Sequence, residues 1–153
     1  MKITITIQPY KLMRYPTLGD WYDDRIFVAE TGDDRYNFLI AIHELVEQFL
    51  CQFDGVEEKD VTDFDLKHLD SDEPGTLLTA PYRNQHADAE QVEKLMSNIL
   101  GVNWKEYGDY ITLFLKGQNQ IKTNMSPKVK KRQMAKGKVA KPVQGVRKNK
   151  KTK

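Results

Sequence analysis

The chain has 153 residues with 24 basic and 22 acidic side chains, a length that supports one domain with its own hydrophobic core. Its only cysteine, Cys51, excludes an internal disulfide, and no apolar run approaches the roughly 18 residues of a membrane span, so we expect a cytoplasmic protein. The charge is uneven: residues 1–120 hold all the acidic residues and 11 basic ones and carry −11, while residues 121–153 carry +13.

Two strands are predicted near the N-terminus. Lys2–Gln8 alternates isoleucine with polar residues, which is the period-two pattern of a half-buried strand. Residues 9–24 contain proline, glycine, tryptophan and tyrosine and predict a long connection that covers an apolar surface. Arg25–Thr31 is the second predicted strand.

The strongest helical pattern follows at residues 35–53. Aspartates at 33–34 supply N-cap chemistry before it, and Gly55 ends it. Residues 57–69 have the spacing of a capping box and predict a short helix. Residues 70–82 contain two prolines and a glycine, so we expect an irregular loop that is long enough to be functional.

Two further helices are predicted at residues 84–100 and 104–116, separated by a glycine and a helix-capping asparagine. Beyond them, residues 118–153 contain no acidic and no aromatic side chain. Such a segment cannot bury enough apolar surface to offset the entropy lost on ordering, so we expect a disordered lysine-rich tail.

These elements together predict an α+β fold for residues 1–117. We expect a small antiparallel sheet packed against the central helix at residues 35–53, with two or three further helices completing the domain.

The central helix contains an HExxE motif formed by His43, Glu44 and Glu47. Residues four apart lie on one face of a helix, so His43 and Glu47 can reach one divalent ion. In HExxH zinc hydrolases the glutamate after the first histidine acts as general base, and this predicts Glu44 as the catalytic residue. Here a glutamate replaces the second histidine, and carboxylate oxygen is also a zinc ligand.

A third metal ligand is expected from the helix at residues 84–100. His86 is the preferred donor and Glu90 the alternative, because both follow the long loop that could close over a site. We expect one divalent metal, zinc first, with iron or manganese also compatible with a mixed histidine and carboxylate set. The plainer alternative is a structural pair between His43 and Glu47.

Other reactive side chains are interpreted as structural. Cys51 lies two turns beyond His43 on the same helix, too far for a thiol–imidazole contact, and is expected to be a buried thiol. His68 has no partner at metal spacing and is expected at the surface. The acidic loop lacks the spacing of an EF-hand and is expected to be a solvated turn. Its acidic residues are Asp70, Asp72 and Glu73.

The segments RYPTLGDWYDD, FLIAIHELVEQFLC, FDGVEEKDVTDFD, EPG and APYRNQHADAEQVEKLM together resemble a family of small uncharacterised proteins of tailed bacteriophages and prophages. The resemblance covers residues 14–107. It implies a location in the host cytoplasm and supplies no mechanism. It also implies that the HExxE motif and a PYRxxH segment occur together. In this chain they correspond to His43, Glu44, Glu47, Tyr82, Arg83 and His86.

The basic tail predicts a second activity, non-specific binding of nucleic acid through phosphate contacts. The residues expected to make these contacts are Lys128, Lys130, Lys131, Arg132, Lys136, Lys138, Arg147, Lys148, Lys150 and Lys151. Alternatives are a solubilising appendage, attraction to the acidic part of the chain, or a nuclear address. Two hypotheses follow: a zincin-like metal-dependent hydrolase with a peptide-like substrate, and a non-enzymatic phage accessory protein that binds nucleic acid or a host protein.

Overall fold

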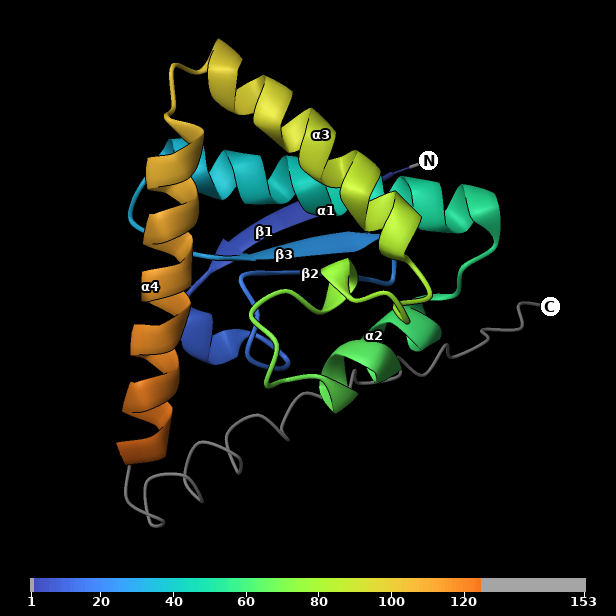
Figure 1. Ribbon diagram of the computed structural model, residues 1–153, viewed down its shortest axis with the longest axis horizontal. Coiled ribbons are helices and arrows are strands. Elements are labelled where there is room, and N and C mark those ends of the chain that lie inside the picture. The colour runs from blue at the N-terminus through green and yellow to red at the C-terminus, as the bar shows by residue number, and fades with distance from the viewer. Residues whose placement is uncertain (1, 125–153) are drawn as a thin grey trace, which may run out of the picture. The chain divides into compact units, whose positions relative to one another are not determined.

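The computed structural model describes residues 2–124 and builds them from three strands, four α-helices and two short 3-10 helices (Figure 1). The elements in chain order are β1 (Thr4–Gln8), η1 (Tyr10–Leu12), β2 (Gly19–Tyr22), β3 (Arg25–Ala29), α1 (Asp34–Asp54), α2 (Glu58–Lys67), η2 (Pro74–Thr76), α3 (Arg83–Ile99) and α4 (Trp104–Asn124). The α+β class and all four predicted helices are confirmed.

The sheet differs from the expected antiparallel one. Its order is β1-β3-β2, with β3 antiparallel to β2 and parallel to β1. The additional strand β2 lies inside the segment predicted as a connection. The chain reverses direction between β1 and β2 and again between β2 and β3. Strands β1 and β3 therefore run in the same direction, and the sheet is mixed.

The turn between β2 and β3 consists of Asp23 and Asp24, which have φ angles of 52° and 55°. Positive φ at both central residues is the conformation of the two-residue turn that matches strand twist, and aspartate tolerates it better than most side chains. The local sequence therefore forms a hairpin without the glycine that usually signals one.

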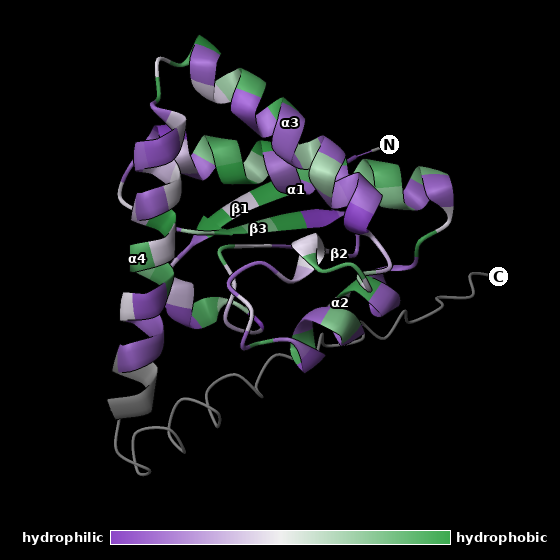
Figure 2. Ribbon diagram, viewed as in Figure 1, coloured by the Kyte–Doolittle hydropathy of each residue, from purple (hydrophilic) through white to green (hydrophobic). Residues whose placement is uncertain are grey.

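Helix α1 packs on β2 and β3 on one side and on α3 on the other (Figure 1). Asp33 caps its N-terminus by accepting a hydrogen bond from the Arg35 backbone, and Gly55, with φ of 75°, ends it in the left-handed conformation. Figure 2 shows hydrophobic residues along β1, β3 and much of α1, and a mainly hydrophilic α3. The core lies between α1 and the sheet, where Ile26, Val28 and Leu39 are fully buried.

Strand β1 forms an edge of the sheet, and its apolar face is only partly covered. Ile5 and Ile7 stand opposite Ile26 and Val28 of β3 in the parallel register, but they remain 47% and 51% exposed. Helix α1 packs mainly on β2 and β3, where the two inner partners lie.

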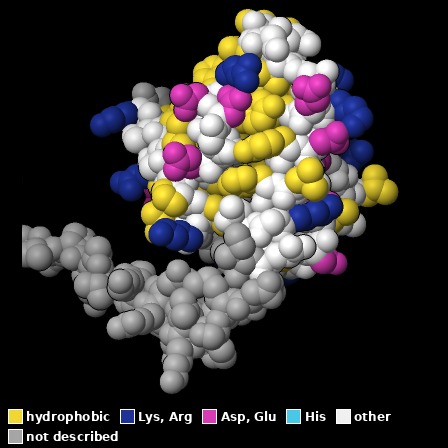
Figure 3. Space-filling view, turned by 90° about the vertical axis from the view of Figure 1, so that its left-hand side faces the viewer, with side chains coloured by type: hydrophobic (Ala, Val, Ile, Leu, Met, Phe, Trp, Pro, Cys, Tyr) yellow, Lys and Arg dark blue, Asp and Glu magenta, His cyan; other side chains and the backbone are white. Residues whose placement is uncertain are grey.

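Helix α4 continues to Asn124 and so runs past the predicted domain boundary at residue 117. Hydrophobic side chains, including Tyr110 and Leu113 of α4, are exposed, and Figure 3 shows the side of the domain on which α4 lies with hydrophobic side chains between acidic and basic ones. No helix in residues 2–124 has both the length and the apolar character needed to cross a bilayer. The tail residues predicted to bind nucleic acid lie outside the described part of the chain.

Candidate metal centre

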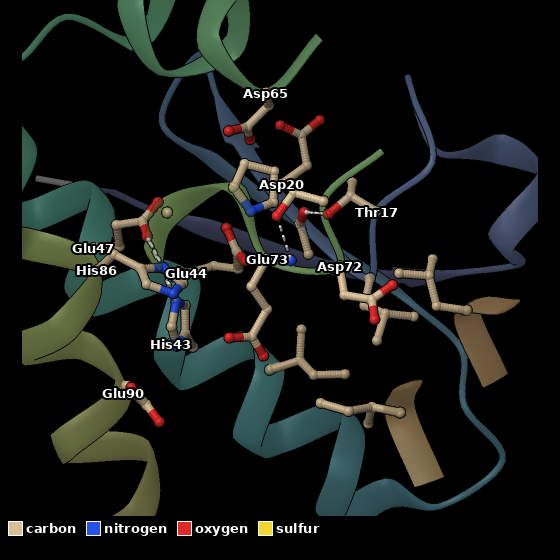
Figure 4. Close-up of a pocket in the computed structure, with 18 of the residues that line it drawn as sticks. Thr17, Asp20, His43, Glu44, Glu47, Asp65, Asp72, Glu73, His86 and Glu90 are labelled. Carbon is tan, nitrogen blue, oxygen red and sulfur yellow. Dashed lines mark hydrogen bonds and ion pairs between the residues drawn. The ribbon is translucent and has the colours of Figure 1, made fainter. Parts of the chain in front are cut away.

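Two helices bring the three expected ligands together. His43 and Glu47 lie one turn apart on α1, on the side that packs against α3, and α3 supplies His86 from its first turn (Figure 4). These three side chains form the group in residues 2–124 that could hold a metal ion. The contact between α1 and α3 therefore supplies what the sequence could not show, the meeting of His43 and His86.

Three donor atoms of the group face one another at short range. His43 Nε2 lies 3.1 Å from His86 Nδ1 and 3.5 Å from Glu47 Oε2, and His86 Nδ1 lies 2.9 Å from the same Glu47 oxygen. Zinc bonds of about 2.0–2.2 Å in tetrahedral geometry place neighbouring donors about 3.3–3.6 Å apart. The three separations therefore fit one face of a zinc tetrahedron after shifts of a few tenths of an ångström.

A second contact orients the imidazole of His43. Its other nitrogen, Nδ1, lies 2.9 Å from Glu93 Oε2, and the Tyr107 hydroxyl donates a hydrogen bond to the second oxygen of Glu93. Glu93 and Tyr107 are both buried. A carboxylate behind the outer nitrogen of a histidine ligand fixes the tautomer that leaves the inner nitrogen free for a metal.

The carboxylate of Glu47 is held in a similar way. Trp21 Nε1 donates a hydrogen bond of 3.1 Å to Glu47 Oε1, which leaves Oε2 facing the two histidines. Burial disfavours the charged form of Glu47, but the hydrogen bonds from His43 and His86 outweigh it and lower its pKa to about 2. Glu47 is thus ionised throughout the physiological range, as a metal ligand must be.

The ionised carboxylates also act on His43. Burial opposes a charged imidazole, yet hydrogen bonds to Glu47 and Glu93 raise the pKa of His43 well above its ordinary value. Without a metal, the group is therefore a compact imidazolium–carboxylate network, which is the structural pair that the sequence left open. A divalent cation and a proton are alternative ways to satisfy the same negative oxygens.

Glu44 occupies the position of the general base in the motif and lines the same cavity as the ligands. The backbone of β2 approaches it closely, because a Cβ atom at Gly19 would lie 2.5 Å from Glu44 Cδ. Burial and the neighbouring charge of Glu47 raise the pKa of Glu44 well above its ordinary value.

The segment around η2 covers His86. A Cβ atom at Gly75 would lie 2.5 Å from His86 Cγ, so the backbone rests directly on the imidazole ring. The loop predicted at residues 70–82 thus closes over the histidine, as expected, and Gly75 is the residue that permits this approach.

A cavity of about 330 Å³ extends from the metal group towards β2 and α2. On its far side Asp65 accepts hydrogen bonds from the hydroxyls of Tyr15, at 3.1 Å, and Tyr82. Burial, opposed by these hydrogen bonds, raises the pKa of Asp65 to about 6. Tyr82 is thereby placed in the cavity wall, whereas Arg83 is exposed.

Glu90 does not join the metal group, although it was the alternative third ligand. It is exposed and lies away from the three ligands in Figure 4. Glu93, one turn further along α3, reaches His43 instead. The sequence could have pointed to Glu93. It follows His86 by seven residues, or nearly two complete helical turns, and so lies on the same face of α3.

The other reactive side chains lie outside the group. Cys51 is fully buried, and burial raises the pKa of its thiol to about 12, which makes it a poor nucleophile. His68 is half-buried, with Nδ1 lying 2.8 Å from the Phe64 carbonyl oxygen. Asp72 forms an exposed ion pair of 3.0 Å with Lys116.

Compared with known proteins, the sequence matches no protein-family model, no curated protein and no solved structure at a significant level. The function must therefore be argued from the geometry of the site.

Proposed function

We propose that the protein is a metal-dependent hydrolase whose metal, zinc, is held by His43, Glu47 and His86. The observation that carries the proposal is the convergence of three donor atoms within 2.9–3.5 Å of one another. A bare structural pair needs one histidine and one carboxylate, while this arrangement adds a second imidazole and an orienting carboxylate on the outer side of the first.

The fit to a metal is chemical as well as geometric. Two imidazoles and one carboxylate are a common ligand set of catalytic zinc sites, which keep a fourth position for substrate or water. A divalent ion in such a site polarises a substrate carbonyl and activates water at neutral pH. Iron(II) accepts the same donors, so metal identity is part of the test.

The chain itself supplies the proton transfer and the binding surface. Glu44 accepts the proton of the attacking water and returns it to the leaving group, the role of the glutamate at this position of an HExxH helix. Glu93 holds His43 in position through Nδ1. The adjoining cavity, with aromatic walls at Tyr15 and Tyr82, accommodates a peptide-like substrate.

Elemental analysis of untagged protein, purified without chelator, tests the metal site. We expect about one equivalent of zinc in the wild type and none in a His43→Ala, Glu47→Ala double variant. Full metal retention after His43→Ala would overturn the ligand assignment, and a metal-free wild type that also resists reconstitution would leave a structural network.

The catalytic role is tested on the zinc-loaded protein with a panel of fluorogenic peptides. Glu44→Gln should retain zinc and lose turnover by a factor of at least about 100, the scale of general-base catalysis. Glu30→Gln, the same change at an exposed glutamate outside the cavity, is the control and should change neither quantity. Normal turnover by Glu44→Gln would refute its assignment as the base.

The second proposal, a phage accessory protein that binds nucleic acid, concerns the basic residues beyond Asn124. A truncation that ends at Asn124 keeps α4 whole, whereas one at residue 117 would cut the helix. We expect the truncated protein to lose salt-sensitive DNA binding, and unchanged binding would exclude the tail as the anchor.

A further inference from the structure

The cavity beside the metal group is lined by carboxylates and by no lysine or arginine from the described residues. The acidic residues in its wall are Asp20, Glu44, Glu47, Asp65, Asp72, Glu73, Glu90 and Glu93. A cavity with one sign of charge repels a ligand of the same sign and attracts the opposite one. Phosphate esters and nucleic acids are therefore poor candidates for this cavity.

Several of these carboxylates already have partners in the protein. Arg14 binds Asp20 through two hydrogen bonds of 2.7 and 2.8 Å. Asp65 accepts from two tyrosines, and Glu93 bridges His43 and Tyr107. These groups are accounted for by the fold or by the metal group.

Glu44, Glu73 and Glu90 are different. Within residues 2–120, none of their carboxylates has a hydrogen bond or ion pair to a protein group, although all three line the cavity (Figure 4). Glu90 lies away from the three metal ligands. Glu44 has its role as the base. Glu73 immediately precedes η2, the segment whose Gly75 rests on His86, so an exposed carboxylate stands at the mouth of the cavity next to the metal group.

The charge of Glu73 also acts on Tyr107, which lines the cavity. The pKa of Tyr107 is raised by burial and by Glu93, and the charges of Glu44 and Glu73 contribute in the same direction. The negative charge of Glu73 thus reaches the metal group from the loop, and within residues 2–120 Glu73 forms no ion pair with a lysine or arginine.

We propose that the substrate is a peptide or amide that carries an ammonium or guanidinium group, which Glu73 binds while the scissile carbonyl lies at the metal group. This inference rests on the proposed hydrolase function and names its substrate class. A charged hydrogen bond to Glu73 supplies the selectivity, and salt weakens it because the residue is exposed.

The test is calorimetric binding of three amino-acid hydroxamates to the zinc-loaded full-length protein. The Nα-acetyl hydroxamates of lysine, norleucine and glutamate are used, so that the three probes share the metal-binding group, carry no α-ammonium, and differ in side-chain charge. Lysine hydroxamate should bind about tenfold more tightly than norleucine hydroxamate, and glutamate hydroxamate should bind most weakly. Glu73→Gln should abolish the preference for lysine, while Glu30→Gln, an equal charge change at an exposed residue outside the cavity, should preserve it.

The outcomes separate the two proposals. Equal binding of all three hydroxamates to a protein with one equivalent of zinc would overturn the substrate class and leave the metal site standing. A lysine preference that persists in Glu73→Gln would overturn the role of Glu73. Failure of every hydroxamate to bind a protein that retains no zinc would refute the proposed function itself.

Discussion

The imidazole of His43 lies 2.9 Å from the carboxylate of Glu93, a residue fifty positions later in the chain on a different helix. This contact joins α1 to α3 at the metal group. It makes the outer nitrogen of His43 a donor, and the inner nitrogen is then the one available to a metal.

Removing this contact should weaken metal binding without removing a ligand. Glu93→Gln is expected to lower zinc affinity about 10- to 100-fold, the usual effect of losing a carboxylate behind a histidine ligand. Competition with a chromophoric chelator measures the affinity. The control is Glu90→Gln on the same helix, and a similar loss in both variants would deny Glu93 a specific role.

Gly75 should be intolerant of a side chain. In Gly75→Ala the new Cβ would lie 2.5 Å from His86 Cγ, so either the η2 segment or the imidazole must move. We expect a loss of unfolding free energy of about 1–3 kcal/mol, typical of overpacking, together with weaker zinc binding.

Gly117→Ala is the control for Gly75→Ala, because a Cβ there meets nothing within 4 Å and the position is helical. It should be neutral or stabilising by up to about 1 kcal/mol. Chemical denaturation of both metal-free variants provides the comparison, and equal stabilities would argue against the close packing of Gly75 on His86.

Gly19→Ala should separate catalysis from metal binding. The added Cβ would lie 2.5 Å from Glu44 Cδ and 2.6 Å from Glu44 Cγ, so most of the Glu44 side chain must move away. We therefore expect near-normal zinc content, a loss of unfolding free energy of about 1–3 kcal/mol from overpacking, and a turnover reduced at least about tenfold because the base is displaced. Unchanged turnover would show that the position of Glu44 is not critical.

Asp65 should give the metal-free protein a pH-dependent stability. Its pKa is raised from 3.8 to about 6, mainly by burial and also by the charges of Glu47 and Asp20, against the hydrogen bonds from Tyr82 and Tyr15. The folded state then binds more protons than the unfolded state between pH 4 and 6, so unfolding free energy falls as pH rises through this window.

Asp65→Asn removes this ionisation. The loss of stability between pH 4 and 6, about 2–3 kcal/mol for this group, should be absent in the variant. Urea unfolding at a series of pH values provides the measurement. An identical pH profile in wild type and Asp65→Asn would show that the aspartate titrates normally.

The sequence predicted the elements with strong periodicity and missed the one without it. The 21-residue helix α1 and the strands β1 and β3 follow from their apolar patterns. Strand β2 has four residues, and its turn of two aspartates lacks the usual glycine. The parallel pairing of β1 and β3 depends on that hidden strand, so the direction of the sheet could not be predicted either.

The sequence predicted the part of the site that lies on one helix. It predicted the part that depends on the packing of two helices only incompletely. His43 and Glu47 are one turn apart on α1, so their proximity follows from helix geometry alone. Placing His86 beside them required the packing of α3 on α1. A single sequence shows which helix faces are apolar, but it does not show which two faces pack together. Glu93 was overlooked because a carboxylate on a mainly polar helix looks like a solvated residue until its partner is known.

Trp21 gives the protein an internal optical reporter. Its indole nitrogen donates to the same carboxylate that faces the two histidines, and Trp104 is the only other tryptophan in the chain. Indole emission responds to the charge of a hydrogen-bonded neighbour. In a Trp104→Phe protein the one remaining tryptophan, Trp21, is hydrogen-bonded to Glu47. Titrating zinc into that protein would let occupancy of the centre be read in solution, without a substrate and in real time.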